Sequence, residues 1–218
     1  MIGFIRTKVK YRQFKKTYKK KNANNNTWAV NLFDLNTIEV GDYSWGGIEI
    51  LNYDPSHKSN IKIGAFCSIA ANTKFMIEGN HRYDRVSTYL FHQAKLYSTE
   101  STAENIQTRG DIVVGDDVWI GFGALIMSGA QIGQGAVIGA NSIVNGIVPP
   151  YSIYIGNKVI KKRFDDKTIE LLKKIDYRIV AKKIREKASL DWDRYFYDDV
   201  STDRILELVS ILEKEILD

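Results

Sequence analysis

His81 is the residue of this sequence best suited to do chemistry. It lies within Gly79-Asn80-His81-Arg82-Tyr83-Asp84, at the start of a long irregular stretch that follows a block of regular repeats. An ordinary imidazole is largely uncharged at neutral pH, so a positioned histidine can take a proton from an attacking hydroxyl as a general base. For one histidine taken alone, however, a structural or surface role is the more common one. The residues and repeats around His81 must therefore decide between a catalytic and a structural role.

Other kinds of catalytic or metal site find little support. We assign structural roles to His57 and His92, and no Cys/His cluster has the spacing of a zinc site, so we expect no bound metal. The sequence has no Gly-x-Ser-x-Gly elbow and no phosphate-binding loop. Cys67, the single cysteine, falls at a small inward position of the repeat and is expected in the core. The acid pairs 116–117 and 165–166 are typical of turns and helix starts.

A repeat of six residues predicts the elements that must hold His81. An aliphatic side chain recurs at Val114, Ile120, Ile126, Ile132, Ile138 and Val144. Small or β-branched side chains follow four positions later, at Val118, Ala124, Ala130, Ala136 and Ser142. Neither an α-helix nor an ordinary strand repeats in this way, so the period predicts an all-β solenoid, the hexapeptide parallel β-helix. We expect the glycines beside the aliphatics to relieve backbone conformations at the corners.

An insertion interrupts this repeat. An earlier block, with Ile63, Ile69 and Phe75 at the aliphatic positions, runs three residues out of phase with the later one. We place the inserted loop at about residues 78–111, and loops of that length in compact domains are usually functional or disordered. Upstream, residues 40–44 resemble one more rung, whereas 46–60 are too irregular to assign.

Three parts are expected, since 218 residues with 44% hydrophobic side chains can build one main domain with appendages. They are a basic N-terminal arm at 1–26, the β-helix domain at 27–160 and a C-terminal helical extension at 161–218. The repeat fades after Val144, and helical spacing takes over. We expect these helices to cap the open end of the solenoid, where strand edges are unpaired.

The basic arm concentrates the positive charge. The chain has a net charge of +5, but nine Lys/Arg and no acid fall within residues 1–21. Tyr11, Phe14 and Tyr18 recur at helical spacing, which indicates a short amphipathic helix packing on the body or on a neighbour. The charges are then either a solvated run or a contact with phosphate or an anionic membrane surface. We expect no nucleic-acid partner.

The cell compartment follows from what the N-terminus lacks. It lacks the long apolar stretch and the small-residue cleavage site expected of a signal peptide, and no run approaches the roughly 18 apolar residues of a membrane span. We expect a cytoplasmic protein whose basic arm could contact the inner face of the membrane. One cysteine excludes an internal disulfide and fits a reducing compartment.

Four segments carry a likeness to a known family. They are Ile63-Gly64-Ala65-Phe66-Cys67-Ser68-Ile69-Ala70, Gly79-Asn80-His81-Arg82-Tyr83-Asp84, Ser87-Thr88-Tyr89 and Val118-Trp119-Ile120-Gly121. Through them the chain resembles the xenobiotic acetyltransferase branch of the hexapeptide-repeat acyltransferases, which includes chloramphenicol and streptogramin acetyltransferases. It looks closer still to related sugar and polysaccharide O-acetyltransferases of bacterial capsule and O-antigen gene sets. The resemblance covers about residues 38–164 and implies a left-handed β-helix.

The resemblance also implies a reaction and its residues. His81 would deprotonate the acceptor hydroxyl, which attacks the thioester of acetyl-coenzyme A directly. The enzyme would be a homotrimer with sites between adjacent β-helices. The residues placed beside coenzyme A are Trp119, Gly121, Gly139, Ala140, Asn157 and Lys158. Those placed beside the acceptor are Asn80, Tyr53 and Tyr89.

Three functions are weighed from the sequence. The first is O-acetylation of a sugar hydroxyl in surface polysaccharide biosynthesis. The second is acetylation of an antibiotic such as chloramphenicol or a streptogramin. The third is a β-helix that serves only as a scaffold, since solenoids often present binding surfaces.

Overall fold

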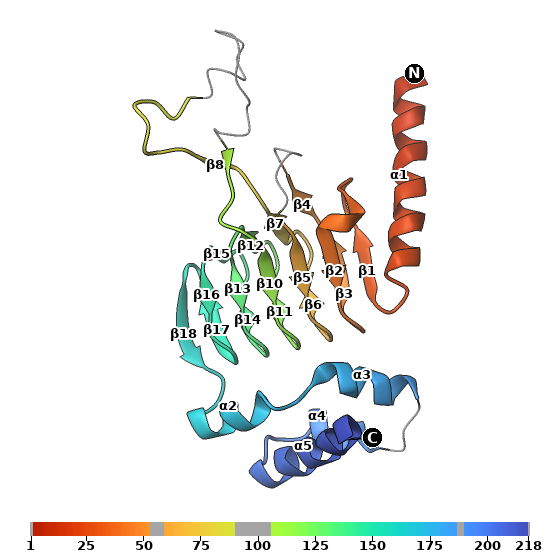
Figure 1. Ribbon diagram of the computed structural model, residues 1–218, viewed down its shortest axis with the longest axis vertical. Helices are drawn as coiled ribbons and strands as arrows, with labels where there is room; N and C mark the ends of the chain where they lie inside the picture. Colours follow the sequence, from red (N-terminus) through yellow and green to blue (C-terminus); the bar gives the residue numbers. More distant parts are fainter. Residues whose placement is uncertain (1, 53–58, 90–105, 187–189, 218) are drawn as a thin grey trace.

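Three narrow sheets form the sides of a prism. A computed structural model describes residues 2–52, 59–89, 106–186 and 190–217 of the chain (Figure 1). Sheet A has the strand order β1-β3-β6-β11-β14-β17-β18, sheet B the order β16-β13-β10-β5-β2, and sheet C the order β15-β12-β7-β4. The pairs are parallel, except that β18 runs antiparallel to β17. Successive strands join successive sheets, which makes the prism a parallel β-helix.

The strands are short, two to five residues each. Sheet A contains β1 (Asn26–Ala29), β3 (Trp45–Ile48), β6 (Ser68–Ile69), β11 (Trp119–Ile120), β14 (Val137–Ile138), β17 (Ser152–Ile155) and β18 (Lys158–Lys162). Sheet B contains β2 (Ile38–Val40), β5 (Ile61–Ile63), β10 (Ile112–Val114), β13 (Gln131–Ile132) and β16 (Ile147–Val148). Sheet C contains β4 (Ile50–Leu51), β7 (Lys74–Met76), β12 (Leu125–Met127) and β15 (Ile143–Val144). Outside the prism, β8 (Asn80–His81) pairs antiparallel with β9 (Ile106–Gln107).

The register gives the length of each coil. Ile120 pairs with Ile138, so one coil takes three repeats of six. Ile69 pairs with Ile120 on the next coil. The segment from Ile69 to Ile120 is longer than an ordinary coil, and the extra length equals five and a half repeats. Because this excess is not a whole number of repeats, the insertion accounts for the phase shift between the two blocks. It leaves after β7 and returns at β10, close to the loop expected at 78–111.

The coil continues beyond Val144, contrary to the expectation that the repeat fades there. Val148 pairs with Ile132, and Tyr154 pairs with Ile138, each two positions earlier than a full coil would bring it. This shortened corner shifts both side chains out of the six-residue phase, which hides them from a pattern search.

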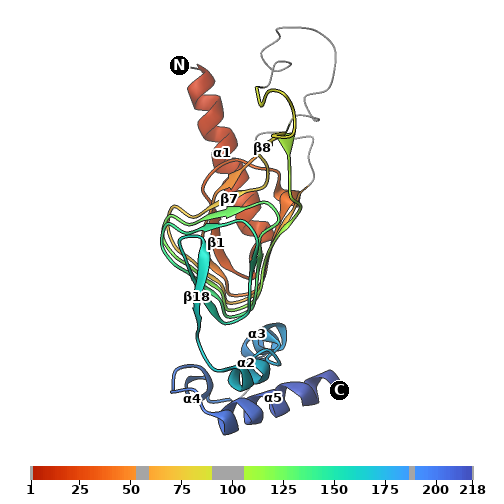
Figure 2. The ribbon, with the colours of Figure 1, turned by 90° about the vertical axis from the view of Figure 1, so that its left-hand side faces the viewer.

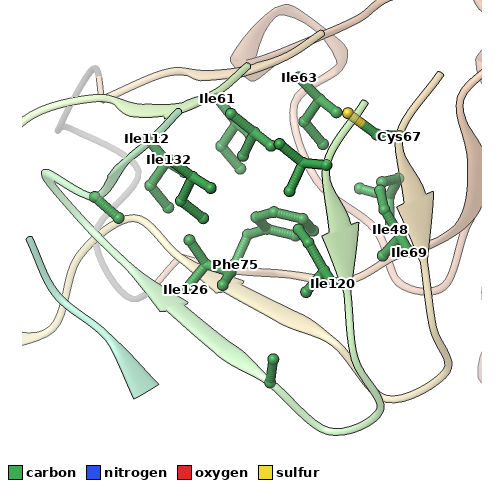
Figure 3. Packing of buried hydrophobic residues seen from close by; sticks show 14 of the residues in the cluster. Ile48, Ile61, Ile63, Cys67, Ile69, Phe75, Ile112, Ile120, Ile126 and Ile132 are labelled. Atoms are coloured by element: carbon green, nitrogen blue, oxygen red, sulfur yellow. The ribbon is translucent and has the colours of Figure 1, made fainter. Parts of the chain in front are cut away.

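The positions that the repeat marks as inward are buried. The six aliphatic residues from Val114 to Val144 are between 0 and 3% exposed. Figure 3 shows Ile112, Ile120 and their neighbours from several strands converging on one narrow interior around Phe75, with Cys67 beside it. Burial raises the pKa of the Cys67 thiol to about 12. Such a thiol stays protonated and acts as a small core residue.

The repeated glycines do not relieve corner conformations, so that expectation is wrong. Gly121 and Gly139 do not have positive φ angles, whereas Gly123 and Asn141, two residues after them, do, at 70° and 54°. A Cβ atom at Gly121 would lie 2.7 Å from the backbone nitrogen of Ala140. The glycine is therefore required because the backbone of the next coil passes directly over it.

The N-terminal arm forms α1 (Ile2–Lys21), which packs beside β1 (Figure 1). Tyr18 is 1% exposed and belongs to the core, and its hydroxyl lies 2.8 Å from Thr27 Oγ1. Phe14 packs edge-on against Phe33 with 5.1 Å between ring centroids. Tyr11 donates a hydrogen bond to a carbonyl oxygen of the segment after β1. The aromatic stripe of the helix thus faces the body. A short 3₁₀ helix, η1 (Leu35–Thr37), precedes β2.

The C-terminal helices do not cap the open end of the solenoid, contrary to the expectation from the sequence. They run along the edge between sheets A and B (Figures 1 and 2). Arg185 forms an ion pair with Asp42 near one end of the coil, while Tyr151 near the other end bonds to the carbonyl of Leu172. These helices are α2 (Asp166–Leu172), α3 (Tyr177–Arg185), α4 (Trp192–Phe196) and α5 (Thr202–Leu217).

The path of the chain explains this placement. After β17 the chain turns back in β18, and the amide of Arg163 donates to the carbonyl of Tyr151 over 2.7 Å, which delivers the chain to that edge. Asp165 then caps α2 by accepting from the amide of Thr168 over 2.8 Å, as the acid pair predicts. Among the described helices, none is long and apolar enough to cross a membrane.

Candidate active site

His81 lies at the root of the inserted loop, where the chain leaves the edge between sheets C and B. In the β8–β9 pair it stands opposite Ile106. The buried hydroxyl of Ser128, on the coil itself, contacts both sides of this root. It accepts a hydrogen bond from the amide of Arg109 over 3.2 Å and a longer one from Asn80 Nδ2 over 3.4 Å. The root of the loop is therefore fixed to the rigid coil.

The imidazole of His81 has a defined orientation. Its Nδ1 atom lies 2.8 Å from the carbonyl oxygen of Thr88. Because a carbonyl oxygen can only accept, this contact places the proton on Nδ1 and makes Nε2 the acceptor of the ring. In the same turn Arg82 Nε donates to Asp84 over 2.7 Å, and this bond lowers the pKa of the Asp84 carboxyl to about 2. The exposed imidazole is thus in the tautomer that a general base needs.

The residues expected beside the acceptor share this loop in part. Asn80 is half-buried and directs its amide toward Ser128 on the coil. Tyr89 is 57% exposed, and its amide donates to the hydroxyl of Ser87 over 3.2 Å. Tyr53 lies outside the described residues. Two of the three expected residues therefore stand on the same loop as His81.

The residues expected beside coenzyme A lie along another edge, between sheets A and C. They are Trp119, Gly121, Gly139, Ala140, Asn157 and Lys158. Trp119 is 56% exposed on the outer side of β11, just before the corner. The backbone at Gly121 touches that of Ala140 on the next coil. The amide of Ile143 donates to the carbonyl of Gly156 over 2.7 Å, which brings the β17–β18 turn to the same edge.

Two side chains in these regions were missed from the sequence. Phe122 is 50% exposed at the corner beside Trp119. Ser128 joins the loop root to the coil. The signal for Ser128 was its place at the corner where the loop is inserted, one coil away. Phe122 shows no signal beyond its apolar side chain at an outward position.

The two groups lie on different sides of one chain (Figure 2). The strand β8 leaves the edge between sheets C and B, whereas Trp119 projects from sheet A, the face opposite that edge. Because side chains stand roughly perpendicular to their sheet, Trp119 points away from His81. Within the described residues, no group of three His, Cys, Asp or Glu could hold a metal ion.

Comparison with known proteins gives concordant matches. Residues 111–146 match the family of bacterial transferase hexapeptides with six repeats. A probable macrolide acetyltransferase of Lysinibacillus sphaericus is 48% identical over 120 residues, which are 53% of this chain and 67% of that protein. A chloramphenicol acetyltransferase of Morganella morganii is 41% identical over 156 residues, 64% of this chain and 74% of that protein.

A solved structure, the maltose O-acetyltransferase of Clostridium difficile 630, superimposes with a TM-score of 0.48 at 26% identity, over 65% of this chain and 67% of that one. The chain spans between 55 and 74% of the length of the curated relatives it matches. The six-residue repeat matches the family model, both curated relatives are covered over two thirds of their length or more, and the chain belongs to the hexapeptide-repeat acetyltransferase family.

Proposed function

We propose that the protein is an acetyl-CoA-dependent O-acetyltransferase in which His81 is the general base. The observation that carries this proposal is the 2.8 Å contact between Nδ1 of His81 and the carbonyl oxygen of Thr88. It holds an exposed imidazole in one orientation with Nε2 as its proton acceptor. The acetyltransferases among the relatives supply the reaction class.

The reaction needs one proton relay. The acceptor hydroxyl gives its proton to Nε2 of His81 while its oxygen forms a bond to the carbonyl carbon of the acetyl thioester. The tetrahedral intermediate then collapses and breaks the carbon–sulfur bond. The proton on Nε2 passes to the departing thiolate, which leaves an acetyl ester and coenzyme A. The bond from Nδ1 to Thr88 keeps the ring aligned through both transfers, and such positioned catalysis contributes about 10²–10⁴-fold.

The edge between sheets A and C suits the donor substrate. Trp119 and Phe122 expose rings that can pack along an extended apolar arm. Lys158 is exposed at the end of this row, where its ammonium group can pair with a phosphate. We assign coenzyme A binding to this edge.

A homotrimer would unite the two regions. Trp119 and His81 project from opposite sides of one prism, so a single copy does not bring both to one acetyl group. A neighbouring copy can present its sheet A edge to the loop of the first. We therefore propose sites between adjacent chains, with the left-handed winding of the family.

The acceptor has two candidates. The relatives named as macrolide and chloramphenicol acetyltransferases favour a hydroxyl on an antibiotic, and this candidate fits at least as well as a sugar hydroxyl of a surface polysaccharide. The sugar is kept because exposed basic side chains on α1 offer a contact with an anionic membrane surface, where such glycans are assembled. The protein would then work in the cytoplasm, at the inner face of the membrane.

One experiment separates these functions. Purified protein is incubated with acetyl-CoA and a panel of chloramphenicol, macrolides, streptogramins and nucleotide-linked or lipid-linked sugars, and release of coenzyme A thiol is measured. Turnover of one acceptor class with kcat/KM in the enzymatic range assigns the substrate. If calorimetry detects no binding of coenzyme A, the result would instead favour a scaffold without catalytic activity.

A further inference from the structure

A cavity of about 470 Å³ lies between the C-terminal helices and the edge between sheets A and B. Its volume falls within the range of about 300–1,000 Å³ that is usual for small-molecule sites. This is the third edge of the prism, distinct from the edge that carries His81 and from the edge beside Trp119 (Figure 2). The cavity therefore needs an explanation of its own.

Aromatic rings form a continuous wall of this cavity. Phe66, on the coil, packs against Tyr177 with 5.7 Å between centroids. Tyr177 packs against Phe196 at 6.1 Å, and Phe196 stacks on Trp192 at 6.0 Å with an angle of 18° between the rings. The faces of such rings carry negative potential and attract cations.

An acid occupies a corner position that aromatic residues hold in three other coils and a glycine in a fourth. Tyr43, Phe66, Asp117, Gly135 and Tyr151 share this position, with φ angles of 59°, 58°, 55°, 68° and 52°. Among these five only Asp117 is charged, and it lines the cavity beside Tyr177, whose hydroxyl bonds to it. Burial raises the pKa of this carboxyl. A carboxylate that is only partly exposed and set among rings favours a cationic neighbour.

The cation already present does not fully fill that role. Arg163 Nη1 lies 3.8 Å from Asp117 Oδ2, beyond hydrogen-bond distance, and donates instead to the carbonyl of Gly135 over 2.7 Å. Its guanidinium lies 5.6 Å from the ring centre of Tyr151 and 5.2 Å from that of Phe164. The guanidinium of Arg163 is thus a cation that already lies close to aromatic rings lining the cavity.

The mouth adds further negative charge. Asp198 and Asp199 both line it, and Arg204 pairs with Asp198 over 3.1 Å and donates to the backbone carbonyl of Asp199. With Asp117 and Arg163, the lining therefore holds three carboxylates and two guanidinium groups. The balance favours a cation over an anion.

We propose that this cavity binds a small organic cation, a primary amine or quaternary ammonium compound with apolar substituents. Its charged group lies near Asp117, and its apolar part lies against Tyr177, Phe196 and Trp192. The site does not depend on acetyl transfer, so it is tested independently of the proposed function.

Calorimetric titration of the full-length protein tests this site. The probes are choline and phenethylamine, each matched with a neutral counterpart of the same shape, 3,3-dimethylbutan-1-ol and 2-phenylethanol. At least one cation is expected to bind with micromolar to millimolar affinity and at least tenfold more tightly than its neutral counterpart. Equal binding of each pair, or no binding of any probe at millimolar concentration, would overturn the proposal.

Two variants locate the binding. Asp117→Asn removes the charge and keeps a residue that tolerates positive φ, and it should weaken cation binding by about tenfold or more. Trp192→Leu removes a ring but keeps an apolar side chain, and it should weaken binding independently if the first variant does not fold. Glu39→Gln, which removes an exposed acid on sheet B, and His81→Ala should leave cation binding unchanged. Retained binding in both cavity variants would refute the site.

Discussion

Nδ1 of His81 and the carbonyl oxygen of Thr88 lie 2.8 Å apart, joined across the first turn of the inserted loop. The partner is a backbone atom, so the loop itself orients the ring, in place of the carboxylate that orients histidine in serine-hydrolase triads. A change of side chain at Thr88 leaves this carbonyl in place. The histidine itself is therefore the informative position to change.

His81→Ala should lower kcat/KM by about 10²-fold or more, because it removes the group that takes the proton in the transition state. Coenzyme A affinity, measured by calorimetry, should stay close to that of the unmodified protein. Tyr83→Ala is the matched control, since Tyr83 is on the same loop and 82% exposed. Near-normal turnover by the His81 variant would exclude it as the base.

Mixed oligomers test the shared site. Trp119→Ala should raise KM for acetyl-CoA by about tenfold, and His81→Ala should abolish turnover. When the two variants are refolded together, some interfaces combine an intact His81 from one chain with an intact Trp119 from another. Activity in the mixture above the sum of the separate variants is expected. Strictly additive activity, or a monomer by light scattering that retains full turnover, would place the whole site within one chain.

Gly121→Ala should destabilise the coil by about 1–3 kcal/mol, the usual cost of overpacking a core position. The added Cβ would lie 2.7 Å from the nitrogen of Ala140, which belongs to the adjacent coil. Gly146→Ala is the control, because a Cβ there meets no atom within 4 Å. Denaturant unfolding of both variants measures the difference. Equal stabilities would contradict a packing role for Gly121.

The coil was predictable from sequence because its interior is narrow. Each six-residue side of a coil must place one aliphatic residue inward, so the period of six identifies Ile120, Ile126 and their partners directly. Val148 and Tyr154 were not recognised as part of the repeat, because a shortened corner shifts their phase without changing the strand pairing. A period reports regular geometry and is lost at the first irregular corner.

Placement of the ends and of the His81 ring could not be predicted. The apolar edge that receives the C-terminal helices is made by Tyr43, Phe66 and Tyr151, which lie far apart in the chain and outside the aliphatic pattern. The partner of His81 is a backbone carbonyl, which no residue type reveals. The motif found the histidine, and only coordinates give its tautomer.

Asp117→Asn should raise the thermal midpoint at pH 7, and only by a small amount because the Asp117 side chain is 38% exposed and solvent weakens the effect of its charge. Burial raises the pKa of Asp117 in the folded state above its ordinary value of 3.8. The folded protein then holds this proton more tightly than the unfolded chain does, so the contribution of Asp117 to stability is greatest at low pH and declines as pH rises through the folded pKa. Calorimetry at neutral and acidic pH should show the gain shrinking as pH falls. A lower midpoint for the variant at pH 7 would contradict this.

Deleting residues 1–21 should lower thermal stability, because it removes Tyr18 from the core and Phe14 from its contact with Phe33. The midpoint of unfolding, followed by circular dichroism, measures the loss. An unchanged midpoint would show that α1 does not stabilise the coil.

The charges of α1 are tested by a variant that keeps the aromatic stripe and replaces four exposed basic residues by glutamine, namely Lys10, Arg12, Lys16 and Lys20. Each basic residue near an anionic surface contributes about 1 kcal/mol, and salt screens that attraction. The unmodified protein should bind anionic vesicles at low salt and release them as salt rises, whereas the charge variant should not bind and should keep its thermal midpoint. Because packing and charge lie on different faces of one helix, the two variants give independent answers. Absence of vesicle binding by the unmodified protein would remove the membrane contact and leave the packing role intact.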